Sequence, residues 1–213
     1  MPKYFVVVAG NIGAGKTSLA RLMAARLGWD AFYESVDDNP YLADFYRDMK
    51  AWSFHLQVFF LGHRAKVHRY LCNEHPNSSI LDRSIYEDAE IFARALHALG
   101  NMQDRDLKAY RSVYDEVIQN LPAPHLLVYL RASVPTLLER IHKRCRDIET
   151  GITADYLSLL NSFYQDWMER FDLCPVLTIP SDELDFVEHE HHLTIIVNRI
   201  LDRLKGKEEI VFH

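Results

Sequence analysis

The feature that most constrains this chain is the run Gly-Asn-Ile-Gly-Ala-Gly-Lys-Thr at residues 10–17. It fits the pattern G-x-x-x-x-G-K-[ST], and an apolar run at residues 4–9, with the length of a buried strand, stands directly before it. Phosphates bind to a concave row of backbone N–H groups at the start of a helix, and glycines let the backbone approach them closely. The run therefore predicts a phosphate loop between a strand and a helix, with Lys16 reaching the β- and γ-phosphates and the Thr17 hydroxyl ligating Mg²⁺.

Strand-like and helix-like patterns alternate along the whole chain. The predicted strands are 4–9, 31–33, 79–81, 125–130 and 176–179. The predicted helices are 16–27, 41–49, 52–72, 87–99, 104–120, 134–144, 154–171 and 193–204. This alternation favours an α/β fold in which a five-stranded parallel sheet carries helices on both faces, and we expect residues 1–213 to form a single domain. In such a sheet, ligands bind at the carboxyl ends of the strands.

The charge balance and the cysteines limit the class of protein. Lys and Arg number 24 against 30 Asp and Glu, a net charge of −6, whereas sequence-independent binding of nucleic acid needs a basic surface. We therefore expect small-molecule ligands and no nucleic-acid polymer. Cys72, Cys145 and Cys174 are widely spaced, which favours reduced thiols in a cytoplasmic protein. The opening apolar run is too short for a membrane span, so we expect no membrane partner.

Charged residues follow three of the predicted strands directly: Glu34, the pair Asp82-Arg83, and Arg131. A hydroxyl that attacks a γ-phosphate benefits from a carboxylate within about 3 Å, and the charge in transfer benefits from an arginine. On the pattern alone, Glu34 is either such a carboxylate or a solvated loop acid, and Asp82-Arg83 is either a site element or a surface ion pair. The chain has no N-K-x-D element, which guanine-reading GTPases need.

With these residues in view, the chain resembles the deoxyribonucleoside kinase family, which comprises the deoxycytidine, deoxyguanosine and deoxyadenosine kinases. The resemblance rests on the phosphate loop and on four segments in the family's order: Y-E-S-V-D-D-N-P-Y-L, W-S-F-H-L-Q, D-R-S-I-Y-E-D and R-C-R-D-I-E-T-G-I. The form D-D-N-P-Y-L is most similar to the bacterial purine-deoxynucleoside branch. The resemblance implies a P-loop kinase fold with an arginine-rich lid at about residues 140–151. It also implies ATP-dependent phosphorylation of a deoxyribonucleoside 5′-hydroxyl for nucleotide salvage, with Mg²⁺.

The resemblance also implies the catalytic roles. Glu34 falls on the carboxylate that contacts the sugar 5′-hydroxyl and acts as general base. Asp82 falls where the family more often has Glu, as a Mg²⁺ ligand or as the proton acceptor, and its side chain is one methylene shorter. Arg83 holds the 5′-oxygen and neutralises charge. The ATP-binding set is implied to be Gly10, Asn11, Ile12, Gly13, Ala14, Gly15, Lys16, Thr17 and Ser18 with the lid residues Arg140, Arg144 and Arg146.

A nucleoside pocket is predicted on the helix at residues 52–72. Gln57 and Arg64 are seven residues apart and therefore share one helix face. By resemblance, Gln57 pairs with the edge of the base, Asp88 partners Arg64, and Phe92 stacks on the base. In the family that the chain resembles, an Arg–Asp pair at this place goes with cytosine or purine acceptors in preference to thymine. The choice among deoxyadenosine, deoxyguanosine and deoxycytidine stays open. The implied partners of the sugar 3′-hydroxyl are Tyr46 and Glu149.

Two other readings remain open at this stage. A nucleoside monophosphate kinase of the thymidylate kinase type would also carry the loop, an Asp-Arg pair and a basic lid. Its acceptor bears a phosphate, however, which Glu34, Asp37 and Asp38 would repel. A nucleotide-binding regulatory module without catalysis is the third reading. The family resemblance further implies a homodimer joined by a four-helix bundle, built from the helices at 52–72 and 104–120.

Overall fold

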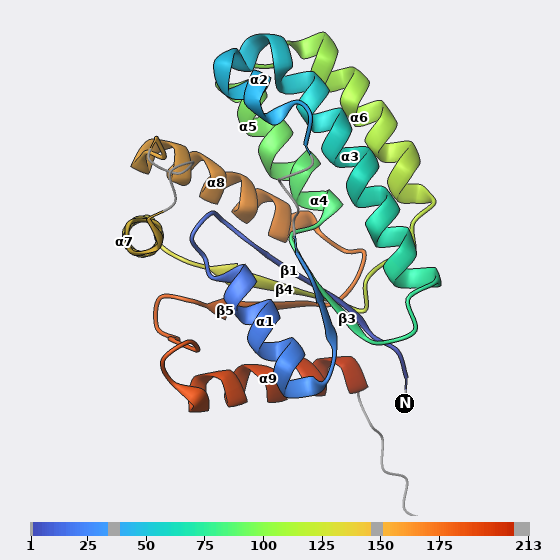
Figure 1. The fold of residues 1–213 in the computed structure, drawn as a ribbon, viewed down its shortest axis with the longest axis vertical. Coiled ribbons are helices and arrows are strands. Elements are labelled where there is room, and N and C mark those ends of the chain that lie inside the picture. Colours follow the sequence, from blue (N-terminus) through green and yellow to red (C-terminus); the bar gives the residue numbers. More distant parts are fainter. Residues whose placement is uncertain (1, 34–38, 146–150, 207–213) are drawn as a thin grey trace, which may run out of the picture.

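The computed structural model describes residues 2–33, 39–145 and 151–206. Within these residues, five parallel strands form one sheet in the order β2-β3-β1-β4-β5 (Figure 1). The strands are β1 (Phe5–Gly10), β2 (Asp30–Phe32), β3 (Ser79–Asp82), β4 (Leu126–Arg131) and β5 (Val176–Pro180). The sheet confirms the predicted α/β fold, and every strand end lies within one residue of its predicted place.

Helices cover both faces of this sheet, which explains why its strands are continuous apolar runs. On one face lie α1 (Lys16–Leu27) and α9 (Glu190–Lys205), with α7 (Val134–Arg144) beside them (Figure 1). The other face carries α3 (Met49–Asn73), α4 (Ile85–Glu87), the π-helical turn η1 (Asp88–Ala93), α5 (Arg94–Ala98), α6 (Asp104–Gln119) and α8 (Ala154–Arg170). The short helix α2 (Leu42–Arg47) packs on α3. Side chains of β1 point alternately to the two faces of the sheet. Val6 and Val8 pack in the core with α1 and α9, and Ala9 packs in the core with α3 and α8.

Among the helix boundaries that differ from the prediction, two have a clear local cause. The helix predicted at 41–49 ends at Arg47, because Asp48 leaves the helical conformation and its carboxylate accepts a hydrogen bond from the Ala51 N–H (3.1 Å), so that α3 begins at Met49. The helix predicted at 87–99 begins at Ile85, because Ser84 and Glu87 form a capping box. None of the helices in the described ranges combines the length and the apolarity needed to cross a bilayer.

Candidate active site

The phosphate loop joins β1 to α1 and depends on its glycines. Gly10, Gly13 and Gly15 have φ angles of 152°, 84° and 98°, which residues with a Cβ rarely adopt. A Cβ on Gly10 would lie 2.8 Å from the Leu130 carbonyl oxygen, and one on Gly13 would lie 2.8 Å from that of Leu137. No described side chain caps the start of α1, so its backbone N–H groups are available to an anion.

Lys16 is buried beneath this loop. Its ammonium group donates to the carbonyl oxygens of Gly10 (2.7 Å) and Asn11 (3.0 Å), at 8% exposure. The Asn11 amide in turn donates to the Leu157 carbonyl oxygen (3.0 Å) and to Asn161 Oδ1 (2.8 Å), both on α8. The loop is therefore held to α8 from the side opposite to α1.

The predicted metal ligands are brought together at the ends of β1 and β3. Thr17 Oγ1 donates to Asp82 Oδ2 over 2.5 Å, and Asp82 is 6% exposed. The pairing of β1 with β3 explains the contact, because it aligns Asp82 with Val8, two residues before the loop. A surface ion pair at Asp82 is thereby excluded.

Arg83 lies between the phosphate loop and the predicted base site. Its φ of 72° is in the left-handed region, and its N–H donates to the Val8 carbonyl oxygen (3.1 Å). Its guanidinium carbon lies 4.5 Å from the centre of the Phe92 ring, a cation–π contact. An arginine after β3 and the aromatic residue predicted to stack on the base thus touch each other.

The remaining residues of the predicted base site come from α3 and η1. Arg64 and Asp88 form a buried ion pair between Nε and Oδ2, and Gln57 is 4% exposed on the same helix as Arg64. Gln57 Oε1 has no hydrogen-bond partner among the described residues. Since a buried polar atom without a partner is costly, this oxygen is a candidate ligand contact. Asp88 begins the π-helical turn and Phe92 lies within it, and such turns occur often at functional sites.

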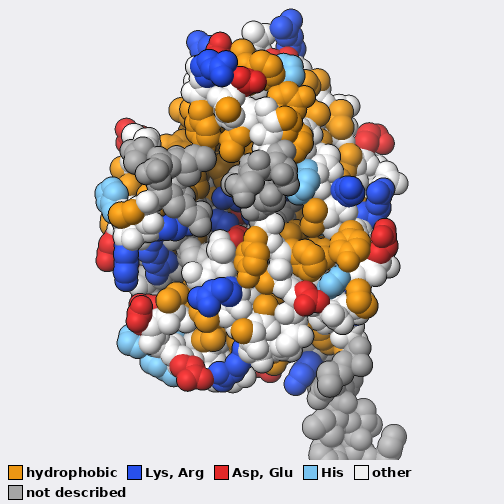
Figure 2. All heavy atoms as spheres, in the orientation of Figure 1, with side chains coloured by type: hydrophobic (Ala, Val, Ile, Leu, Met, Phe, Trp, Pro, Cys, Tyr) orange, Lys and Arg blue, Asp and Glu red, His pale blue; other side chains and the backbone are white. Residues whose placement is uncertain are grey.

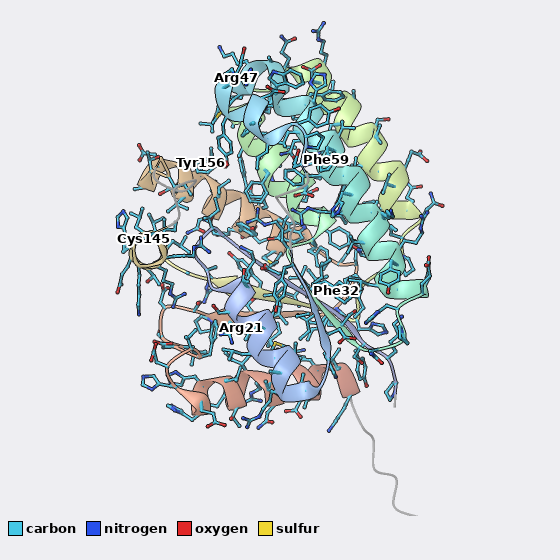
Figure 3. All side chains as sticks on the ribbon, viewed as in Figure 1. Arg21, Phe32, Arg47, Phe59, Cys145 and Tyr156 are labelled. Atoms are coloured by element: carbon cyan, nitrogen blue, oxygen red, sulfur yellow. The ribbon has the colours of Figure 1, made fainter. Side chains whose placement is uncertain are left out.

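Residues of the predicted base site and of the predicted metal site meet in one hollow of the surface. Arg64 and Asp82 line the same small pocket, together with Tyr33. Figure 2 shows that this face is hollowed beneath the α2–α3 layer, with charged side chains at the bottom. Tyr156, near the start of α8, lies towards α2 in Figure 3. Burial raises the pKa of its hydroxyl, and the electrostatic interactions of Tyr156 include Arg83 and the predicted sugar residue Tyr46.

The basic residues of α7 are divided between two places. Lys143 and Arg144 are exposed near its end, where Figure 2 shows Lys and Arg side chains gathered. Arg140 instead donates to the carbonyl oxygens of Ala14 (3.2 Å) and Ser181 (2.6 Å) and to Ser181 Oγ (2.7 Å), so it supports the loop from below. A contact between Arg140 and ATP stays a prediction. Glu34, Arg146 and Glu149 lie outside the described residues, and their predicted roles remain predictions.

Sequence reasoning missed several residues around the loop. Glu87 is fully buried and accepts hydrogen bonds from both Gly10 and Ser84, while the Tyr164 hydroxyl lies 2.7 Å from it. Phe186 covers Gly15, where an added Cβ would meet its ring at 3.1 Å. The Ser84-x-x-Glu87 spacing is a readable capping-box signal, whereas nothing local in the sequence indicates the contacts of Tyr164 and Phe186.

Known proteins match both the chain and its structure. The family model "Deoxynucleoside kinase" matches residues 6–205. Deoxyadenosine/deoxycytidine kinase of Bacillus subtilis is 36% identical over 203 residues, which are 94% of this chain and 93% of the relative. Deoxyguanosine kinase of Lactobacillus johnsonii is 37% identical over 215 residues, 96% of this chain and 95% of the relative. The structure of deoxyadenosine kinase from M. mycoides with bound dATP aligns with a TM-score of 0.81 at 29% identity, covering 93% of this chain and all of that one. The chain therefore belongs to the deoxynucleoside kinase family.

Proposed function

We propose that this kinase transfers the γ-phosphoryl group of ATP to the 5′-hydroxyl of a deoxynucleoside at the edge where β1 and β3 end. One observation carries the proposal: Thr17 of the phosphate loop contacts Asp82, and the next residue, Arg83, lies on the Phe92 ring. The predicted phosphate-binding element and the predicted base-binding element thus adjoin one another. The names of the relatives, deoxyadenosine, deoxyguanosine and deoxycytidine kinases, support the same acceptors.

In the proposed reaction, the 5′-oxygen forms a bond to the γ-phosphorus while the bond to the ADP oxygen breaks. The loop N–H groups and Lys16 bind the phosphate oxygens, and Lys16 exchanges its hydrogen bonds to the Gly10 and Asn11 carbonyls for phosphate contacts. Arg83 stabilises the charge on the transferring group. We assign the hydroxyl proton to Glu34, with Asp82 as the alternative acceptor.

The residues present fit a magnesium ion. The Thr17 hydroxyl and the Asp82 carboxylate are hard oxygen donors, and they lie together beside the loop. Magnesium at a nucleotide needs only one or two protein ligands, because phosphates and water supply the others. When bound, the ion would neutralise charge on the β- and γ-phosphates. Thr17 and Asp82 would hold it.

We assign selection of the base to Gln57 and to the Arg64–Asp88 pair. The Gln57 amide can both donate to and accept from one edge of a base, and its Oε1 is buried without a described partner. A base that lacks the matching edge would leave this oxygen unpaired. We therefore propose deoxyadenosine, deoxyguanosine or deoxycytidine as acceptors in preference to thymidine. The family match disfavours both alternatives, a nucleoside monophosphate kinase and a regulatory module.

We further propose that two copies associate through α3 and α6. A groove of about 570 Å³ runs between these helices, lined in part by Gly62, Ala65, Val113 and Val117. Val113 is 51% exposed, and small residues on α3 would let a second helix pair approach closely.

A cytoplasmic location is a separate proposal. It is supported by Cys72, Cys145 and Cys174, which are all free thiols.

Initial rates with radiolabelled ATP test the proposed reaction. The four deoxynucleosides and their 5′-monophosphates are compared as acceptors, with and without Mg²⁺. We expect label transfer to deoxyadenosine, deoxyguanosine or deoxycytidine, slower transfer to thymidine, and loss of turnover when the metal is removed. Turnover of the monophosphates alone would contradict the proposal.

A further inference from the structure

Glu87 is a fully buried acid that lies outside the residues assigned to either substrate. It lies on α4 at 0% exposure, and each of its oxygens lies within hydrogen-bonding distance of two donor groups. Oε1 lies 3.2 Å from the Gly10 N–H nitrogen and 2.7 Å from the Tyr164 hydroxyl. Oε2 accepts from the Ser84 N–H (2.9 Å) and the Ser84 hydroxyl (3.3 Å). A buried carboxylate is costly unless donors surround it, and this one is surrounded.

The donors come from three separate segments of the site. Gly10 begins the phosphate loop at the end of β1, Ser84 directly follows Arg83, and Tyr164 is on α8. The Tyr164 hydroxyl also lies 2.8 Å from the Gly10 carbonyl oxygen, so its single hydrogen can be donated to either of these two neighbouring acceptors. Burial and the neighbouring Glu87 raise the pKa of Tyr164 well above its usual value, so the hydroxyl keeps that hydrogen. One carboxylate therefore links the phosphate loop to the turn that carries Arg83.

Arg83 needs such a link because its backbone is held in an unfavourable conformation. A residue with a Cβ rarely adopts a φ of 72°, and it keeps that angle only where its surroundings impose it. The Arg83 N–H is held by the Val8 carbonyl oxygen on β1, and the following N–H, that of Ser84, is held by Glu87. The residue is thus fixed on both sides.

From this geometry we infer that Glu87 is a positioning residue for phosphoryl transfer: it fixes the Arg83 turn relative to the phosphate loop without touching a substrate. The inference rests on the proposed role of Arg83 in the transfer step. Since misplacing a catalytic group by about 1 Å can cost about 100-fold in rate, a carboxylate behind the site can govern kcat.

Glu87→Gln tests the inference with almost no change in volume. An amide presents only one oxygen, so its NH₂ group must face donors either at Gly10 and Tyr164 or at Ser84. We expect kcat to fall by about 10- to 100-fold, with little change in the KM values for the nucleoside and ATP. Tyr164→Phe removes one donor and keeps the carboxylate, so it should give a smaller loss of the same kind. Tyr164→Phe also serves as the test variant if Glu87→Gln does not fold.

Glu90→Gln is the matched control. Glu90 is another buried acid of the same helical segment, at 9% exposure, but its partners are Arg111 and Arg170 on α6 and α8. We expect this variant to lower the melting temperature and to leave kcat unchanged. A similar loss of kcat in both variants would reduce Glu87 to a stabilising residue and overturn the inference.

A double-mutant cycle with Arg83→Gln decides whether Glu87 acts through Arg83. In the Arg83→Gln background, Glu87→Gln should have little further effect on kcat, because the group it positions is gone. Multiplicative losses, or a rise in the KM for ATP alone, would overturn the inference. If Arg83→Gln is inactive while Glu87→Gln keeps its kcat, only this inference fails. If Arg83→Gln itself keeps full activity, the proposed mechanism fails with it.

Discussion

Different parts of the chain form the two proposed halves of the active site, the phosphate half and the nucleoside half. The phosphate half is mostly backbone, because Gly10, Gly13 and Gly15 shape a loop that leads into a helix start with no described side-chain cap. The nucleoside half is made of side chains, in which Gln57 projects from α3 and the ion pair joins α3 to η1. A backbone site tolerates little change in shape. In a site made of side chains, substitutions can alter the ligand preference while the fold stays the same. Any buried ion pair in such a site must nevertheless keep both partners.

Arg64→Met should have the largest effect on stability, because it leaves the Asp88 carboxylate buried without its partner. We expect the free energy of unfolding to fall by about 3–5 kcal/mol, measured by urea denaturation. The control is Arg47→Met, which breaks the exposed pair with Asp44, where the two side chains are 78% and 34% exposed, and should cost less than about 1 kcal/mol. Equal losses in the two variants would contradict the view that the nucleoside half depends on a buried pair.

Lys16→Ala should affect the phosphate half alone. Loss of a positioned cation at the transferring phosphates is expected to lower kcat by about 10²- to 10³-fold. The affinity for the deoxynucleoside, measured by calorimetry without ATP, should stay unchanged, because Gln57, Arg64 and Asp88 are intact. A parallel loss of nucleoside affinity would show that the two halves are not independent.

Gln57→Leu should have the converse effect. Removing the base contact is expected to cost about 1–3 kcal/mol of binding in the transition state, or about 5- to 150-fold in kcat/KM for the preferred deoxynucleoside. ATP binding should not change, and stability should be unchanged or higher, because Gln57 Oε1 has no partner among the described residues. Gln165→Leu, at an exposed position of α8, is the control and should leave kcat/KM intact. Equal kcat/KM values for Gln57→Leu and the unmodified enzyme would remove Gln57 from the base site.

The smallest expected effect is a pH dependence of stability that arises on α3, the helix of the nucleoside half. His68 is fully buried there, its Nε2 lies 2.7 Å from the Pro122 carbonyl oxygen, and burial lowers the pKa of its imidazole below 6.5. The unfolded chain then binds the proton more readily than the folded one. The stability that neutral His68 contributes to the fold is therefore complete above about pH 6.5. As the pH falls below that value, the free energy of unfolding decreases by at most about 1.4 kcal/mol per pH unit.

Urea denaturation of the unmodified enzyme and of His68→Gln, at pH 7.5 and pH 5.5, measures this contribution. The variant should lose less stability on acidification than the unmodified enzyme. Equal losses in both proteins would exclude His68 as the source of the pH dependence.

The same contrast explains how much could be predicted from the sequence. The phosphate loop, β1 and α1 could be predicted from a local pattern. The glycines and the apolar run that determine them are adjacent in the sequence. The parallel sheet agrees with the alternation of strands and helices, whereas its strand order was not predicted. The Arg64–Asp88 contact joins residues 24 positions apart on two elements, and only the family resemblance predicted it.

Other features depend on packing that no local pattern records. The guanidinium of Arg140, whose contact with ATP stays a prediction, donates to Ala14 and Ser181, and no local pattern indicates these contacts. The contact of Tyr164 with Gly10 joins residues 154 positions apart. The helix predicted to begin at Glu87 begins at Ile85, since Glu87 serves as the capping residue of the turn after β3.

The most direct test of the central claim is a crystal structure of the protein with deoxyadenosine and a non-hydrolysable ATP analogue. The account predicts the base between Gln57 and the Phe92 ring, and the 5′-oxygen within about 3 Å of the Arg83 guanidinium and in line with the γ-phosphorus. A nucleoside bound away from Arg83, with its 5′-oxygen directed to solvent, would contradict it.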